Sequence, residues 1–415
     1  MSSSFFRVST ANMYDGAIRN LGARQSQLVG LQENLSSGKR VVRASDDPVA
    51  AAQAERALTR MERIKTEQRQ LESQRNAMAL AESTLGDAVE MVQQMRELMV
   101  AAGRGGQTSN DRNTYATQLQ SLRDQMQEII NRKDTNGQPL LGALGSALQP
   151  FAGALQFDGL PGQAGSSGTA IAGSVDGHAA LMFDPVRDGV YDAKVTHAPG
   201  STLSSTPAQT FNRSLMDGAS YQLDINSVTV DPTDGSTTVD YTLTKTDKDG
   251  SIFADIFTSA PTPPGQAIAI DIMEGADKVM SFGLKGTPVQ FDQVTLTPSP
   301  GLMQSIDAAI QGLKQAGNDA SGSQVVTQAL AHMDAGLERL FTVRGYAGEL
   351  LNRADRITGD QDTRAVQLEA DRSRAEDLDM VKGISEFQNA NIGYEAALKS
   401  YAQVQRLSLF NYING

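Results

Sequence analysis

The sequence predicts an α+β fold: a long antiparallel helical bundle formed by the N- and C-terminal regions, with a central antiparallel β domain inserted between them. Proline placement is the first reason, because 12 of the 14 prolines lie between Pro150 and Pro300 and helix interiors exclude proline. The second reason is that apolar residues in both flanks recur with the seven-residue period of helices that pack along a seam. The middle instead has short alternating segments separated by turn sequences.

The longest predicted helix runs from Asp47 to about Ala102 and carries the first seam. Asp47 can accept hydrogen bonds from the first free N–H groups of this helix, and Pro48 suits its first position. The helix would be roughly 80 Å long at about 1.5 Å per residue, so its seam needs equally long partners. The bundle-seam residues on it are Ile64, Leu71, Met78, Leu85, Val92 and Met99.

A companion seam, three residues further on, changes character along this helix. It is polar at Arg60, Glu67 and Gln74 but apolar at Ala88 and Met95. The pattern therefore predicts a coiled-coil-like bundle and not an ideal two-stranded coil.

Shorter helices are predicted on either side of the long one. Residues 12–35 carry leucines at heptad spacing, and Asp111 to Arg132 has an apolar face. Asn136-Gly137 is a strong hairpin-turn signal, and Pro139-Leu140-Leu141 is expected to continue as a short strand.

The C-terminal flank begins with a predicted helix over residues 302–316, followed by a second long seam that is interrupted at Arg344. Helical pattern resumes at about Thr363 and continues to Leu409. The seam residues selected here are Leu330, Met333, Leu337, Leu340 and Leu351.

The extreme C-terminus is amphipathic and unusually apolar for a chain end. Chain ends are commonly frayed, so an apolar end is better explained if it packs against another subunit. The residues expected to form this assembly and chaperone-binding tail are Leu398, Tyr401, Leu407, Leu409, Phe410, Tyr412 and Ile413.

The middle of the chain, residues 151–300, reads as one antiparallel β domain or two small ones. It carries 7 Lys and Arg against 17 Asp and Glu, which argues against nucleic acid as a partner. Turns are predicted at Pro232–Gly235, Asp247–Gly250 and Pro263–Gly265, and the Gly- and Ser-rich run 159–168 is expected to be a mobile loop. The clearest strand candidates are Val190–Thr196, Tyr221–Val230, Thr237–Thr244, Ile268–Met273 and Val289–Thr297.

Residues that could carry catalysis or bind a metal or cofactor are not found. The three histidines are far apart in sequence, there is no Cys, and no zinc motif is present. Asp247-Lys-Asp-Gly250 resembles the start of a calcium loop, but Thr258 stands where the bidentate Glu is required. No apolar run approaches the roughly 20 residues of a membrane span. The sequence therefore predicts a protein that is not an enzyme, uses no cofactor and enters no membrane.

One segment carries a family resemblance. Ser36-Ser-Gly-Lys-Arg-Val-Val-Arg-Ala-Ser-Asp-Asp-Pro-Val-Ala-Ala-Ala-Gln-Ala54 is similar to the corresponding stretch of hook–filament junction proteins in the flagellin superfamily. Leu407-Ser-Leu-Phe-Asn-Tyr-Ile413 and the turn at Asn136-Gly137 point the same way. The resemblance covers roughly residues 1–150 and 302–415 and leaves out the middle.

The resemblance implies a structural adaptor that joins the hook side of the bacterial flagellum to its filament. The implied partners are copies of the chain in one layer, the first hook-associated junction protein, flagellin, and a cytoplasmic export chaperone on the C-terminal tail. Secretion through the flagellar export apparatus is implied, in keeping with an N-terminus that lacks a signal-peptide core. Two rival functions stay open: a filament flagellin, and a surface-binding module carried by the β domain.

Five regions follow from the patterns together with the resemblance. The terminal regions are expected to be disordered alone and to fold on assembly, the alternative being a helical hairpin already paired in one copy. The regions are 1–45, an N-terminal assembly helix; 46–150, the first half of the bundle; 151–300, the variable outer β-rich part; 301–374, the second half of the bundle; and 375–415, a C-terminal assembly helix.

Overall fold

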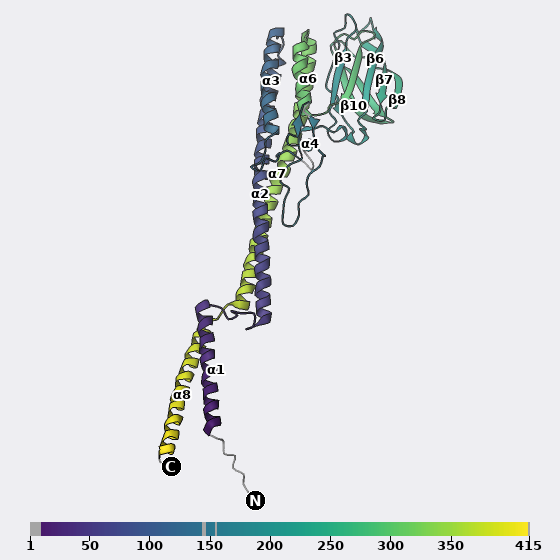
Figure 1. The fold of residues 1–415 in the computed structure, drawn as a ribbon. Helices are drawn as coiled ribbons and strands as arrows, with labels where there is room; N and C mark the ends of the chain where they lie inside the picture. The colour runs from purple at the N-terminus through teal and green to yellow at the C-terminus, as the bar shows by residue number, and fades with distance from the viewer. Residues whose placement is uncertain (1–9, 143–146, 154–155, 414–415) are drawn as a thin grey trace. The chain divides into compact units, whose positions relative to one another are not determined.

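The computed structural model describes residues 10–142, 147–153 and 156–413, and it confirms the α+β class (Figure 1). The chain divides into two compact units, which are described separately below. Unit 1 is Met1–Arg69 with Thr358–Gly415, and unit 2 is Gln70–Ile357. Two helices have residues in both units: α2 (Pro48–Ala102) and α7 (Asp319–Glu376).

The helical part of unit 2 is built from α2, α7, α3 (Ser109–Ile130) and α6 (Leu302–Gln315). Helix α3 starts with a reciprocal capping box, in which Thr108 accepts from the Asp111 N–H and Asp111 accepts from the Thr108 N–H. Gly336 lets α6 approach α7 closely, since an added Cβ would lie 2.5 Å from the Leu302 side chain.

The seam of α2 in unit 2 is almost completely buried, with Leu71 at 1% exposure and Met78, Leu85, Val92 and Met99 at 0%. On α7 the buried positions step by three residues from Val326 and then by four, so the seam passes through Ala329 and Leu350 instead of the predicted Leu330 and Leu351. Leu330 and Leu351 therefore lie at the flank of the core and are half-buried, whereas Met333, Leu337 and Leu340 are buried. The buried seam of α7 is Val326, Ala329, Met333, Gly336, Leu340, Val343, Ala347, Leu350, Ala354 and Ile357.

This register removes the interruption predicted at Arg344. Val343 occupies the seam instead, and Arg344 extends sideways to Glu82, where its Nε lies 2.7 Å from Oε1.

Between the helices and the β domain lies a segment of short elements whose apolar side chains belong to the helical core. Pro139-Leu140-Leu141 makes a single bridge between Lys133 and Pro139 and forms no strand. Residues 159–168 are irregular, as expected. The elements of this segment are β1 (Phe151–Ala152), β2 (Gln156–Phe157), α4 (Gly177–Leu181) and α5 (Pro185–Asp188).

The β domain consists of two antiparallel sheets around a core of its own (Figure 1). The larger sheet has the order β3-β11-β6-β7-β8, and in the smaller one β10 pairs with β9 on one side and with β4 and β5 on the other. The bounds are β3 Tyr191–Thr196, β4 Ser204–Ser205, β5 Gln209–Thr210, η1 Arg213–Leu215, β6 Ser220–Val230, β7 Thr237–Thr246, β8 Ile252–Thr258, β9 Ile268–Glu274, β10 Asp277–Lys285 and β11 Gln293–Pro298.

Most strand predictions match these bounds, and the three predicted turns connect β6 to β7, β7 to β8 and β8 to β9. The prediction of a strand from Val289 was wrong at its start, because residues 289–292 form a turn. Asp292 accepts from the Val289 N–H at 2.8 Å and Phe291 has a positive φ of 71°. Strands β8 and β10 were not predicted: β8 is apolar on both faces and β10 contains a bulge, so neither alternates cleanly.

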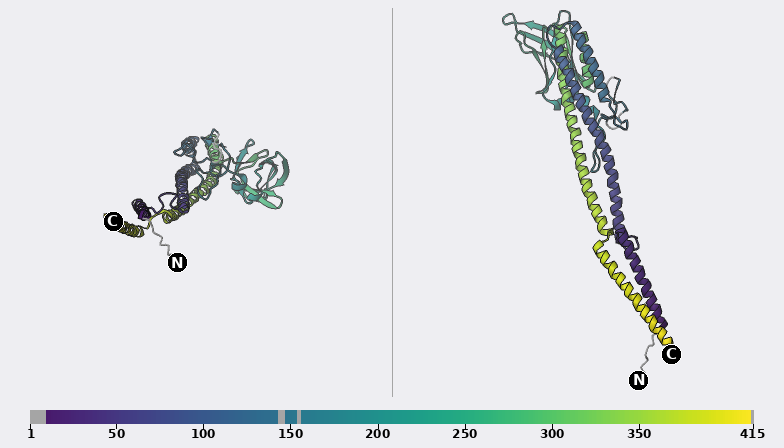
Figure 2. Two further views of the ribbon diagram at one scale, coloured as in Figure 1. Left: turned by 60° about the horizontal axis from the view of Figure 1, so that its bottom comes forward. Right: turned by 90° about the vertical axis from the view of Figure 1, so that its left-hand side faces the viewer.

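Unit 1 pairs helix α1 (Thr10–Ser37) with α8 (Met380–Ile413), which lie side by side in Figures 1 and 2. The prediction that helical pattern lapses before Thr363 was wrong, because α7 continues without a break to Glu376. The break comes at Asp377–Asp379, where Asp379 Oδ1 accepts from the N–H groups of Val381 and Lys382, each at 3.1 Å. Asp379 thus starts a new helix.

Candidate assembly surface

A backbone clip joins the end of α1 to the start of α8 in unit 1. Arg40 N–H donates to Glu376 O at 2.7 Å, and Leu378 N–H donates to Gly38 O at 2.9 Å. Lys39 and Asp377 form an antiparallel bridge between them. The clip makes α1 and α8 antiparallel neighbours, although over 300 residues separate them in sequence.

Charged side chains reinforce this clip. The Arg40 guanidinium donates to Ala375 O at 2.8 Å and lies 3.1 Å from Asp47 Oδ2. Glu376 pairs with Lys39 and, at 3.1 Å, with Arg372. Sequence reasoning missed these residues, because no local pattern connects a basic pair near residue 40 with an acidic pair near residue 376.

The segment that carries the family resemblance folds into the turn between α1 and α2. Asp46 accepts from the N–H groups of Val42 and Arg43 at 3.2 and 2.8 Å. Asp47 Oδ1 accepts from the Ala50 N–H at 3.0 Å, and α2 begins at Pro48, so both lie in the predicted cap positions. The Ala50 N–H and then the Arg40 guanidinium hold the pKa of Asp47 below its usual value.

Behind this turn, the described residues of unit 1 form a small core. The side chains packed there are Val41, Ala50, Ala54 and Ala375, most of them alanines. A groove of about 460 Å³ opens beside them, and its lining includes Val42, Ala51, Leu58 and Glu376.

Large apolar side chains remain on the surface of the paired helices α1 and α8. On α1, Ile18 and Val29 are 55% and 59% exposed. On α8, Val381 and Ile392 are 82% and 65% exposed, and Ile384 is also exposed. The heptad leucines of α1 are only half-buried. In unit 1, then, the pairing of α1 with α8 leaves apolar surface uncovered.

The predicted tail residues belong to α8. Leu398 is exposed and Tyr401 is half-buried. The side chains of the other five, Leu407, Leu409, Phe410, Tyr412 and Ile413, lie outside the described residues, as does the N-terminal Met1-Ser-Ser-Ser segment.

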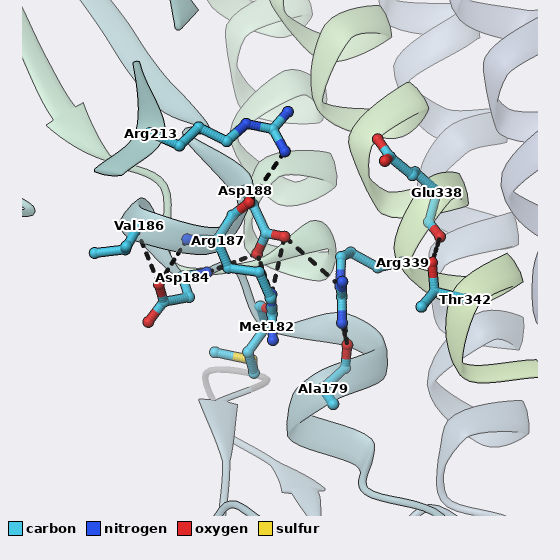
Figure 3. A network of polar contacts seen from close by, with 10 residues as sticks. All are labelled: Ala179, Met182, Asp184, Val186, Arg187, Asp188, Arg213, Glu338, Arg339 and Thr342. Carbon is cyan, nitrogen blue, oxygen red and sulfur yellow. Dashed lines mark hydrogen bonds and ion pairs between the residues drawn. The ribbon is translucent and has the colours of Figure 1, made fainter. Parts of the chain in front are cut away.

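A second candidate surface is the β domain, and the short helices α4 and α5 that precede it in the chain are attached to α7 through polar contacts. Figure 3 shows the Asp188 carboxylate between the guanidinium groups of Arg187 and Arg339. Asp188 also accepts from the Asp184 N–H at 2.8 Å, and Arg339 donates to Ala179 O at 3.1 Å. Burial, and then the charge of Arg187, lowers the pKa of Arg339.

Three further side chains of α7 cover the outer edge of strand β3. Gln324 and Gln328 donate to Ala193 O at 3.1 and 2.7 Å, and His332 Nε2 lies 3.1 Å from Tyr191 O. His332 Nδ1 is 3.3 Å from Asp192 Oδ1. Burial lowers the pKa of His332 and raises that of Asp192, and the charge of each group opposes the shift of the other. These groups close the sheet edge that faces the bundle.

The described residues contain no cluster of His, Asp or Glu that could hold a metal ion. None of the helices in this part of the chain has an apolar stretch of membrane-spanning length. Of the three histidines, His332 already contacts Tyr191 and Asp192 of strand β3.

Comparison with known proteins gives a consistent result. Residues 8–145 match the family model for the bacterial flagellin N-terminal helical region. Flagellar hook-associated protein 3 of Salmonella typhimurium is 32% identical over 154 residues, which are 35% of this chain and 46% of that protein. The N-terminal region of the chain therefore matches the flagellin family, and the chain is similar to flagellar hook-associated protein 3.

Two further likenesses extend over more of the molecule. The crystal structure of flagellar hook-associated protein 3 from Legionella pneumophila aligns with a TM-score of 0.58 at 21% identity, covering 77% of this chain and 99% of that one. A flagellin of Clostridium tyrobutyricum is 23% identical over 95% of this chain and 97% of its own length. The chain spans about half the length of the Salmonella relative.

Proposed function

We propose that this chain is a structural component of the extracellular bacterial flagellum and forms the junction between hook and filament. The observation that carries the proposal is the uncovered apolar surface of α1 and α8, including Ile18, Val29, Val381 and Ile392. Apolar patches of this kind mark interaction sites in soluble proteins. This role requires no chemical reaction. It requires surfaces on the chain that are complementary to the subunits on either side of it.

Copies of the chain pack through these helices in a head-to-tail arrangement. Head-to-tail contacts suit an open helical assembly, because no closed ring limits the addition of further subunits. On one side the layer meets the first hook-associated protein, and on the other it meets flagellin. The acidic β domain, which is held to α7 by polar contacts, takes no part in this packing.

Before assembly, the apolar C-terminal tail is the part of the chain that a cytoplasmic export chaperone binds. Its residues Leu398 and Tyr401, with the apolar sequence Leu407–Ile413, supply the binding surface. The chain then leaves through the flagellar export apparatus and its terminal regions, 1–45 and 375–415, order on assembly. Amide hydrogen exchange on the free protein tests this, because both regions should then exchange far faster than the unit 2 part of α2.

The decisive experiment is complementation of a strain that lacks the gene. A chain ending at Asp379, without α8, should fail to hold filaments on hooks and should shed flagellin into the medium. The double variant Ile384→Ser and Ile392→Ser should do the same, because it removes exposed apolar contacts while keeping the helix. Gln388→Ser with Asn391→Ser changes exposed polar residues of the same helix and is the matched control. Normal filament attachment with the truncated chain would overturn the proposal.

A second candidate function is filament flagellin, favoured by the nearly full-length match to the clostridial protein. The two functions differ in copy number and position. Immunogold labelling would show a flagellin along the whole filament and a junction protein only at its base.

A further inference from the structure

The two edges of the five-stranded sheet are treated differently. Strand β3 has its outer carbonyl groups covered by Gln324, Gln328 and His332 of α7. Strand β8 pairs only with β7, and among the described residues no element covers its other side. Proteins normally protect a sheet edge because its free N–H and C=O groups can pair with another chain.

The side chains of β8 are also unusual for an edge strand. All seven residues are exposed, and Ile256, Ile252 and Phe253 are 75%, 67% and 59% exposed. The isoleucines lie on one face of the strand, and Phe253 and Phe257 lie on the other. Strand β8 contains no Pro, no Lys and no bulge, and Asp255 is its one charged residue.

The hydrogen-bond register shows which groups of β8 point outward. Ser259 N–H donates to Val239 O at 2.8 Å, so that opposed pair is a hydrogen-bonded one. Because such pairs alternate in antiparallel sheets, Phe253, Asp255 and Phe257 also bond to β7. The N–H and C=O groups of the intervening residues therefore face away from the sheet, and these residues are Ile252, Ala254, Ile256 and Thr258.

This edge is held in place before any partner arrives. The Asp240 carboxylate of β7 accepts from Thr258 Oγ1 and from Ser227 Oγ of β6, both at 2.7 Å. The rings of Phe257 and Tyr241 stack with centroids 5.8 Å apart. A preformed edge binds a strand without the entropy cost of ordering itself.

We propose that β8 is a docking edge for an extended segment of another protein, which adds to the sheet as a sixth strand. The segment has alternating apolar side chains and a Lys or Arg opposite Asp255. Backbone bonding supplies affinity in this mode of recognition, and the alternating side chains supply specificity. This inference is independent of the junction function.

Charge disfavours a second copy of the chain as the occupant. If β8 paired antiparallel with β8 of another copy over all seven residues, Asp255 would lie directly opposite its counterpart. That pair would be non-hydrogen-bonded, the kind in which side chains are closest, and opposed like charges are unfavourable there. The surrounding region 151–300 has 17 acidic against 7 basic residues, so a basic segment is the complementary partner.

The test uses the full chain and a blocked peptide, Trp-Thr-Val-Ile-Lys-Ile-Val-Thr. The protein has no Trp, so the fluorescence anisotropy of the peptide reports binding directly. Ala254→Pro removes one outward N–H without touching the β7 ladder and should weaken binding at least about tenfold, whereas Ala254→Ser should bind like the wild type. Asp255→Lys should reverse the preference, favouring the same peptide with Glu in place of Lys.

A second arm covers the case in which Ala254→Pro does not fold. A peptide N-methylated at its edge-facing amides should then lose binding to the wild type. Equal binding by the methylated and unmethylated peptides would overturn the proposal. So would concentration-dependent dimers of the wild type that Asp255→Lys leaves intact, because the edge would then be filled by a second copy.

Discussion

Helix α2 offers a comparison within one element, because its two parts bury different amounts of apolar surface. Its unit 2 part buries Leu71, Met78, Leu85 and other large side chains. The buried residues described on its unit 1 part are Ala50, Ala54, Ala57 and Ile64. The companion seam of α2 shows the same difference, because it is polar at Glu67 in the unit 1 part and apolar at Met95 in the unit 2 part.

The difference separates residues that hold one copy together from residues that remain for a partner. Burying a large aliphatic side chain contributes about 1.5–3 kcal/mol, and an alanine contributes much less. Unit 2 can therefore be stable by itself. Unit 1 has a clip and a small core, and large apolar groups such as Ile18, Val381 and Ile392 are at its surface.

The largest effect is expected from Leu85→Ala in unit 2. Leu85 is fully buried, so its truncation should lower the free energy of unfolding by about 2–5 kcal/mol. Chemical denaturation followed by circular dichroism measures this. Leu80→Ala on the same helix is the control, because Leu80 is 43% exposed and should change stability far less. Similar losses in both variants would contradict the comparison.

The next effect tests the register of the α7 seam. Leu350→Ala should destabilise unit 2 by about 2 kcal/mol, since Leu350 lies in the core at 4% exposure. Leu351 is half-buried, so Leu351→Ala should cost less than half as much in the same denaturation experiment. If Leu351→Ala destabilised the protein more than Leu350→Ala, the α7 seam would pass through Leu351, as the sequence predicted.

A stabilising substitution is expected in unit 1. Gln361 is 3% exposed, and its side-chain oxygen and nitrogen have no hydrogen-bond partner among the described residues. Gln361→Leu should raise the stability of unit 1 by about 1–3 kcal/mol, because it removes unsatisfied buried groups. Thermal unfolding of the variant beside Gln53→Leu, an exposed site on α2, measures the difference. A loss of stability would show that Gln361 bonds to something, such as ordered water.

The smallest effect concerns pH. Hydrogen bonds from the Thr108 side chain and then its backbone lower the pKa of Asp111 below 3.8. A carboxyl group whose pKa is lower in the folded state stabilises the fold at any pH above its pKa in the unfolded state. This stabilisation is lost as the pH falls through the folded-state pKa. The melting temperature, measured from pH 5 downward, should therefore depend less on pH for Asp111→Asn than for the wild type. Parallel curves would show that the capping box contributes nothing through charge.

The sequence was sufficient for features that depend on neighbouring residues. The α2 start at Asp47-Pro48 and the turn at Pro232–Gly235 are local signals, and the structure has helix and hairpin there. The phase of the α7 seam was harder, since Ala329-Leu330 and Leu350-Leu351 each offer two adjacent apolar residues. A seven-residue period alone cannot decide which one faces the core.

The candidate sites were less accessible to sequence reasoning. The clip between Arg40 and Glu376 joins distant segments, so no window of the sequence contains it. Apolar residues such as Ile392 follow the same helical pattern whether a neighbour covers them or not. Strand β8 was missed for a related reason, because exposure on both faces removes the alternation by which strands are found.

The separation of the two hydrophobic cores in unit 2 has an evolutionary consequence. Among the described residues, none belongs to both the helical core and the β-domain core, and the β domain contacts α7 through polar side chains such as Gln324 and Gln328. Mutations inside the β-domain core are therefore expected to leave the packing of the helices unchanged. A lineage could enlarge, shrink or replace this insert under pressure from its surroundings while the scaffold beneath it stays constant.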